Sequence, residues 1–222
     1  QLLDLLAQCA PEPVIERLFR DGAELLPAEL ASAAGDELRW QDVVGGLRRY
    51  GIVARSRIAA LDGEQALQLH RLTQQVALNP DASRPSLKMS LAALMLRALP
   101  ADPRLPENWP VHAHLLPHVL ATVTADVTAG EERAVFALTG RIARYMCAGP
   151  AIFAQAQRLS RRALDLGTRF FGAEHPNTLE AMLALAFTLW ASGDYAAAQV
   201  LEEQVLEISR KTGIGAQFSL TT

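Results

Sequence analysis

Histidine is the residue type in this chain best suited to metal, phosphate or acid–base chemistry, and the chain has five. Three of them lie close together, and His114 and His118 are one helical turn apart, a spacing that can present two imidazoles to one metal ion. A structural zinc site needs four ligands, and no cysteine or suitably spaced carboxylate completes the set with His112. We therefore expect these histidines to pack and predict no metal site.

His70 stands at a different kind of position. It follows the alternating stretch Ala66–Leu69 and precedes a predicted helix, so its side chain should lie near a helix N-terminus, where anions are favoured. An imidazole there can donate to a phosphate group. The alternative is a hydrogen-bonded structural histidine at a strand-to-helix junction. His175 is expected only to cap a helix or to pack in a loop.

The sequence offers no other catalytic group. No nucleophile–base pair or pair of catalytic carboxylates is recognisable, and no Gly-x-x-x-x-Gly-Lys-Ser/Thr phosphate loop is present, since Arg210 precedes Lys211-Thr212. Cys9 and Cys147 stand among apolar residues and should be buried thiols, as in a reducing, cytoplasmic environment. We expect the chain alone to be neither an enzyme nor a holder of a cofactor.

Composition narrows the class of protein further. Half of the 222 residues are hydrophobic and 20% are charged, which is typical of a globular chain, and the net charge of −3 gives no general attraction to nucleic acid or membrane. No apolar run approaches the roughly 20 residues that cross a bilayer. The chain opens inside an apolar helical pattern at Gln1, so we expect a piece of a longer protein. Its preference for Arg over Lys indicates a bacterial, GC-rich genome.

Residues 1–80 combine helices with a short β-pattern. Asp62-Gly63 is a turn signal between two apolar–polar runs, so a hairpin is expected around it. Helices followed by a small hairpin form the layout of a winged-helix-like module. The helices expected here are Leu2–Cys9, Val14–Phe19, Pro27–Ala34, Asp42–Tyr50 and Leu72–Leu78.

Arginines near this hairpin raise the question of DNA binding, because winged helices can place such residues on phosphates. They are Arg48, Arg49, Arg55 and Arg57. However, residues 1–80 hold 8 Arg and no Lys against 11 Asp and Glu, whereas DNA-binding modules are usually basic. A solvated or interdomain face is the preferred interpretation.

Residues 81–130 are expected to form a linker and a helical connector. Asn, Pro, Asp and Ser crowd into the segment Asn79–Pro85, which predicts a linker. Helices are predicted over Leu87–Leu99 and Val111–Val123, separated by the proline-rich loop Pro100–Pro110.

Residues 131–222 contain an internal repeat with a period of 42 residues. Phe153–Leu159 aligns with Tyr195–Leu201, and Ala163-Leu164 aligns with Val205-Leu206 at the same offset. A fixed period of this size is typical of a helical solenoid. The expected fold class is therefore mainly α, with a winged-helix-like module followed by an α-solenoid of about two repeats.

Two motifs give this solenoid a family resemblance. Gly172–Leu179 and Gly193–Ala198 resemble the entry loop and the Gly-x-Tyr turn of kinesin-light-chain-type tetratricopeptide repeats. The resemblance implies a module that binds a protein or peptide.

The N-terminal part resembles the winged-helix portion of NB-ARC-type STAND nucleotide-binding switch proteins. The residues that carry this resemblance are Leu47–Val53 and Leu69–Gln74. In that family a Met-His-Asp-Leu motif opens the helix after the hairpin, and its histidine reaches the β-phosphate of ADP. Here Leu69 stands for the Met and Arg71 for the Asp. The resemblance implies that His70 contacts ADP, with ADP or ATP held by a nucleotide-binding domain of the same parent protein.

A second candidate site lies in the last repeat. Leu183, Phe187 and Trp190 recur at helical spacing and form an apolar face, while Met182 and Leu189 belong to a second apolar face of the same helix. Either a following repeat or a protein partner should cover the first face.

Two functions from different classes remain. One is a regulatory and protein-interaction segment of a STAND-type ATPase switch. The other is a transcription regulator with a DNA-binding winged helix and a tetratricopeptide-repeat sensor.

Overall fold

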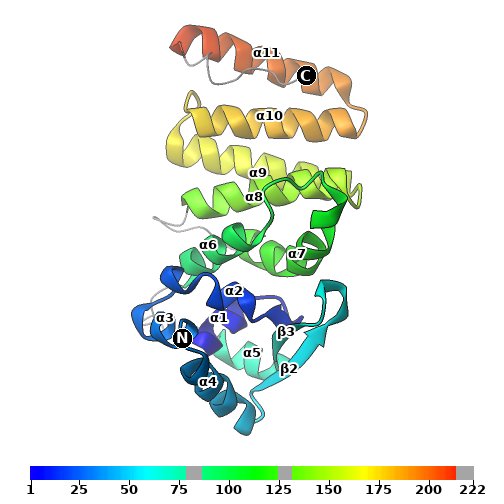
Figure 1. Cartoon of the computed structure of the whole chain (residues 1–222). Helices are drawn as coiled ribbons and strands as arrows, with labels where there is room; N and C mark the ends of the chain where they lie inside the picture. The colour runs from blue at the N-terminus through cyan, green and yellow to red at the C-terminus, as the bar shows by residue number, and fades with distance from the viewer. Residues whose placement is uncertain (79–86, 125–131, 214–222) are drawn as a thin grey trace. The chain divides into compact units, whose positions relative to one another are not determined.

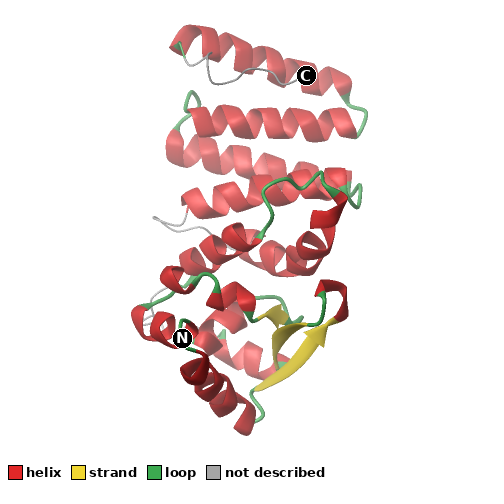
Figure 2. Cartoon of the chain, in the orientation of Figure 1, coloured by secondary structure: helices red, strands yellow, loops and turns green. Residues whose placement is uncertain are grey.

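The structure is a computed structural model that describes residues 1–78, 87–124 and 132–213. The fold is mainly helical, with one small three-stranded sheet (Figure 2). The chain divides into two compact units, residues 1–101 with 107–138 and residues 102–106 with 139–222. The predicted linker Asn79–Pro85 lies outside the described residues.

The first unit holds the sheet and the helices α1 to α7 (Figure 1). Its elements, in chain order, are α1 (Leu2–Gln8), β1 (Val14–Ile15), α2 (Arg17–Arg20), η1 (Ala23–Leu25), α3 (Ala28–Ala34), α4 (Glu37–Arg49), β2 (Val53–Ile58), η2 (Ala59–Leu61), β3 (Glu64–Leu69), α5 (Arg71–Ala77), α6 (Lys88–Ala98) and α7 (Trp109–Thr124). The division between the units also falls within η3 (Pro106–Asn108).

The sheet has the strand order β1–β3–β2, and both pairs are antiparallel. Asp62 (φ 52°) and Gly63 (φ 77°) lie between β2 and β3 with left-handed backbones, a conformation that Asp and Gly tolerate better than most residues. The hairpin predicted around Asp62-Gly63 is therefore confirmed.

The helix predicted over Val14–Phe19 is wrong in its first half. Val14 and Ile15 form β1 and pair with Leu67 and Ala66 of β3, and only then does α2 begin. Both side chains are about 1% exposed, and β-branched residues fit a pleated, buried position well. Pairing with a strand some 50 residues away overrides the local helical pattern.

Helix α4 begins five residues before the predicted start at Asp42. Asp36 is its N-cap, and the Asp36 side chain accepts a hydrogen bond from the backbone N–H of Arg39 at 3.0 Å. The early start brings Trp40 into the core beside Phe19, with ring centroids 6.2 Å apart. Tyr50, the last residue of the predicted helix, is the C-cap of α4 and is 79% exposed.

The core of the first unit joins the sheet to helices from both halves of its sequence. Its largest fully buried side chains include Trp40, Phe19, Leu67, Leu91 and Leu115. By their contacts, α6 and α7 belong to the same compact unit as residues 1–78. The boundaries 1–80, 81–130 and 131–222 themselves stay predictions.

The second unit contains α9 (Phe153–Phe171), α10 (Pro176–Ala191) and α11 (Tyr195–Thr212), and the division between the units falls within α8 (Glu132–Ala148). Helix α10 packs against α9 on one side and α11 on another, so the three lie in sequence order (Figure 1). Gly193 (φ 89°) makes the turn, and Asp194 then caps α11 by accepting from the backbone N–H of Ala197 at 3.2 Å. The helices and the turn predicted here are confirmed.

No helix in the described part of the chain is both long and apolar enough to cross a membrane.

Candidate functional site

His70 occupies the junction predicted for it. The chain leaves β3 at the buried Leu69, and the backbone N–H of His70 donates to the carbonyl of Ile52 at 3.2 Å. His70 is then the N-cap of α5. Its own ring is exposed, so the fold fixes the backbone at this position and leaves the imidazole accessible.

One ring nitrogen of His70 is engaged. Nδ1 accepts a long hydrogen bond from the backbone N–H of Leu72 at 3.4 Å, as a capping side chain does. A neutral imidazole that accepts through Nδ1 carries its proton on Nε2. The donor of His70 is therefore the outer nitrogen, which has no partner among the described residues.

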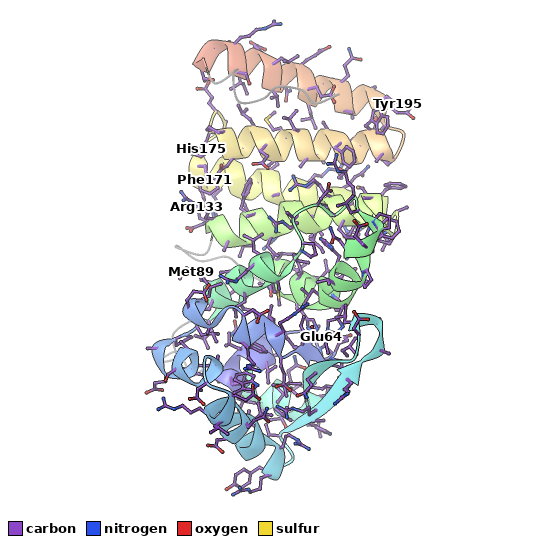
Figure 3. All side chains as sticks on the ribbon, in the orientation of Figure 1. Glu64, Met89, Arg133, Phe171, His175 and Tyr195 are labelled. Atoms are coloured by element: carbon purple, nitrogen blue, oxygen red, sulfur yellow. The ribbon has the colours of Figure 1, made fainter. Side chains whose placement is uncertain are left out.

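His175 repeats this geometry at the start of α10. Its Nδ1 accepts from the backbone N–H of Asn177 at 3.1 Å, and its ring stacks on Phe171 with centroids 5.1 Å apart (Figure 3). The expected capping role of His175 is confirmed. Because His70 and His175 share this arrangement, capping alone can account for a histidine at either position, and the nucleotide role of His70 stays a prediction.

Helix α5 is anchored on one side and open on the other. The buried Gln74 donates to the carbonyls of Ala7 and Cys9 and so ties α5 to the end of α1. Leu72 and Val76, one turn apart, are 66% and 76% exposed. Beside His70 there is therefore an exposed apolar strip on a helix whose position is fixed.

Only part of the second candidate site, the predicted face of Leu183, Phe187 and Trp190, is exposed to solvent. Phe187 and Trp190 are 42% and 58% exposed, whereas Leu183 is half-buried against the cluster formed by Leu179, Met182 and Val205. The other predicted face of α10, which includes Met182 and Leu189, is buried as expected. The three residues thus do not form one open surface, and their role in binding a partner stays a prediction.

Tyr195, which was not predicted as a residue of this site, extends its exposed part. The rings of Trp190 and Tyr195 meet edge to face with centroids 6.2 Å apart, and Tyr195 is 62% exposed. Figure 3 shows Tyr195 at the start of α11. Tyr195 is the aromatic of the repeated turn, so its position next to the end of the preceding helix was the available signal.

Helix α10 lies between α9 and α11, which bears on what could cover Phe187 and Trp190. A following repeat would meet α11 first, because α11 already packs against α10. A partner is therefore a better candidate than a following repeat to cover these two side chains.

The histidines of α7 act in packing. His112 and His118 are fully buried; His112 Nδ1 lies 2.9 Å from the carbonyl of Asn108, and His118 Nε2 lies 3.1 Å from the carbonyl of Pro13. Burial lowers the pKa of His118 to about 4, although the Pro13 carbonyl opposes this shift. Among the residues that the structure describes, no group of three or more His, Cys, Asp or Glu side chains could hold a metal ion.

Arg55 has an internal partner. Its guanidinium contacts the 5%-exposed Glu16, with Nε 2.6 Å from Oε1, and Trp40 Nε1 donates to Oε2 of the same carboxylate at 2.7 Å. One of the four arginines considered for DNA phosphates is therefore used within the fold. This network could not be predicted from the sequence, because Trp40 and Arg55 are 24 and 39 residues from Glu16.

Both cysteines are free and buried, as expected. Burial raises the pKa of the Cys9 thiol to about 12 and that of Cys147 to about 11, so neither is a reactive thiolate.

Comparison with known proteins assigns a family to the last part of the chain. Residues 153–211, from the start of α9 to near the end of α11, match the tetratricopeptide repeat family. No curated protein matches the chain. No solved structure matches it either. The repeat prediction is thus confirmed for α9 to α11, and tetratricopeptide repeats point to a role in protein–protein interaction.

Proposed function

We propose that the chain is the regulatory and protein-interaction segment of a STAND-type ATPase switch. In this proposal the first unit contacts ADP through His70 in the resting state, and the repeats bind a protein partner. The observation that carries the interaction role is the tetratricopeptide match over 153–211, together with two exposed aromatic side chains, Phe187 and Trp190.

The topology of the first unit supports a winged-helix assignment. Helices α3 and α4 are followed directly by the β2–β3 hairpin, and β1, from before these helices, joins the same sheet beside β3. The resemblance of Leu69–Gln74 to the STAND motif falls where the hairpin passes into α5.

The surroundings of His70 support a contact with another domain. A proton on Nε2 makes the exposed ring nitrogen a donor, which is what a phosphate oxygen requires. Leu72 and Val76 offer apolar area on the same helix, and exposed apolar patches commonly mark interaction surfaces. A nucleotide-binding domain of the parent protein would cover this strip and bring ADP to His70.

Nucleotide content tests the proposal directly. The intact parent protein should purify with bound ADP, because the domain that contains the phosphate loop supplies most of the affinity. The 222-residue chain alone should neither bind nor hydrolyse ATP, since one imidazole cannot replace a nest of amides, a lysine and a metal-ligating hydroxyl. Micromolar binding of ATP or ADP to the isolated chain by calorimetry would contradict this division of roles.

The DNA-binding alternative predicts a different behaviour. A regulator of that kind would be retained on DNA at low salt and released as salt rises. The engagement of Arg55 with Glu16 supports the switch proposal over this alternative, because a paired, largely buried guanidinium contributes little to a phosphate-binding face.

A further inference from the structure

The 42-residue repeat allows α9 and α11 to be compared position by position. In α9, the residues that face α10 include Leu164, which packs against both apolar clusters of α10 and α11. Gln157 lies on the same side and donates to the Ser192 hydroxyl at the end of α10 at 2.7 Å. Ser160, between them, is fully buried.

The equivalent residues of α11 are uncovered. Leu206 replaces Leu164 and is 42% exposed, and Tyr195, equivalent to the half-buried Phe153, is 62% exposed. Gln199 and Glu202, in place of Gln157 and Ser160, are also exposed. We call Tyr195, Gln199, Glu202 and Leu206 the α11 stripe.

Spacing and chemistry make the α11 stripe self-complementary. Its residues are separated by four, three and four positions, so the pattern is the same in both directions along the helix. When two copies of α11 run antiparallel about a two-fold axis between Val200 and Leu201, Tyr195 meets Leu206 of the second copy. Gln199 then meets Glu202, and each contact occurs twice, as an isologous interface requires.

We propose that the α11 stripe is a homodimerisation surface whose occupant is α11 of a second copy of this chain. Tyr195 and Leu206 bury apolar area at the two ends, and the Gln199 amide donates to the Glu202 carboxylate near the axis. Trp190, in contact with Tyr195, borders the apolar ends. This inference goes beyond the proposed nucleotide switch and does not depend on it.

Glu202 is the residue that favours a second copy over a further repeat helix. A helix that packed on α11 as α10 packs on α9 would bury position 202, where α9 carries the small Ser160. An unpaired carboxylate is costly to bury, whereas the antiparallel pairing supplies it with a donor. A contact between two single helices also buries less accessible surface than the about 1,200–2,000 Å² that stable interfaces bury, so the dimer should be weak and reversible.

Sedimentation equilibrium of the 222-residue chain over about a hundredfold range of concentration tests the proposal. The wild type should form dimers that dissociate on dilution. Gln199→Lys should tighten the dimer by about threefold to tenfold, because a lysine facing Glu202 is introduced twice. Gln199→Glu should weaken it by a similar factor. Gln204→Lys and Gln204→Glu, on the opposite side of α11, are the matched controls and should leave dimerisation unchanged.

Circular dichroism of each variant at low concentration reports whether α11 is still helical, since Gln199 also donates to Glu203 at 2.8 Å. A wild type that stays monomeric throughout overturns the proposal, as do equal effects at positions 199 and 204. Loss of the dimer in Phe187→Glu but not in Gln199→Glu also overturns it, because the exposed face of α10 would then be the interface. A monomer that instead binds a peptide of residues 173–194 at the α11 stripe shows that a repeat helix, not a second copy, is the occupant.

Discussion

At the scale of single residues, the stability of the first unit depends on one buried ionic network. The Glu16 carboxylate accepts from Trp40 Nε1 and contacts the Arg55 guanidinium, which also donates to Gln41. These contacts connect the start of α2, helix α4 and strand β2. A carboxylate taken out of water to this degree needs its counter-charge.

Removing Arg55 should therefore strongly lower the stability of the first unit. We expect Arg55→Ala to lower the free energy of unfolding by about 3–5 kcal/mol, because the charge of Glu16 would be left buried with only the indole as a donor. Arg57→Ala, on an exposed position of the same strand, is the matched control and should cost less than about 0.5 kcal/mol. Urea unfolding measures both. Similar losses for the two variants would show that the network contributes no special stability.

His118 should make stability depend on pH. Its pKa is lowered from 6.5 to about 4 in the folded state, so the unfolded chain binds more protons between these values. Stability from the neutral ring is fully present above about pH 6.5 and decreases as pH falls toward 4. At about 1.4 kcal/mol per pKa unit, the whole loss is about 3 kcal/mol.

Unfolding free energies at pH 7 and pH 5 test this contribution. The loss between the two pH values should be smaller in His118→Leu than in the wild type, because the variant has no buried ring at position 118 that takes up a proton on unfolding. The absolute stability of the variant also changes through the lost contact with Pro13, so only the pH dependence is compared. An unchanged pH dependence would exclude His118 as its source.

At the scale of elements, helix α6 lies very close to Gly22, the residue between α2 and η1. An added Cβ at Gly22 would lie 2.3 Å from Leu94 Cδ2 and 3.3 Å from the carbonyl oxygen of Leu18. Leu94 is 1% exposed and has little room to move. Helix α4 presents the opposite case, because nothing lies within 4 Å of a Cβ added at Gly45 or Gly46.

Alanine substitutions at these glycines should therefore have opposite signs. We expect Gly22→Ala to destabilise the chain by about 1–3 kcal/mol through overpacking, with partial rescue by Leu94→Val. Gly46→Ala should stabilise it by about 0.5–1 kcal/mol, since alanine is the better helix former. Thermal unfolding of the three variants checks the prediction. A neutral Gly22→Ala would mean that α6 approaches α2 less closely than the structure indicates.

Elements whose signal is local were predictable from the sequence. The helices of the repeats, the Gly193 turn and the Asp62-Gly63 hairpin follow from periodicity, capping and turn chemistry within a few residues. Strand β1 was not predictable in this way, because two β-branched residues after a proline gain their structure from β3, about 50 residues away. Helix α4 starts at a local signal, the Asp36 cap, but the contacts that bury Trp40 against Phe19 and Glu16 are long-range.

The same distinction applies to the candidate sites. The junction that holds His70 could be predicted because a strand and a helix signal meet there. The division of the α10 face into the half-buried Leu183 and the exposed Phe187 and Trp190 could not, since it depends on where α11 packs. Tyr195, in contrast, has a sequence signal, because the aromatic of the repeated turn lies next to the end of the preceding helix.

At the scale of the whole molecule, the two units have different supporting evidence for function. The second unit has a matched repeat family over 153–211 and exposed aromatics, which support protein interaction. In the first unit, the proposed function depends on one imidazole that is also a helix cap. Separating these two roles of His70 is therefore the central experimental question.

The rate of ADP release from the intact parent protein, measured for His70→Asn, separates them most directly. Asparagine is a good N-cap, so the substitution keeps the capping role and removes the outer nitrogen of the ring. A hydrogen bond to a charged group is worth about 1.5–3 kcal/mol, so ADP release should accelerate by roughly ten- to a hundredfold, with little change in melting temperature. His175→Asn, at the matching cap of α10, should leave ADP release unchanged. An unchanged release rate in His70→Asn would contradict the switch role and leave His70 as a helix cap.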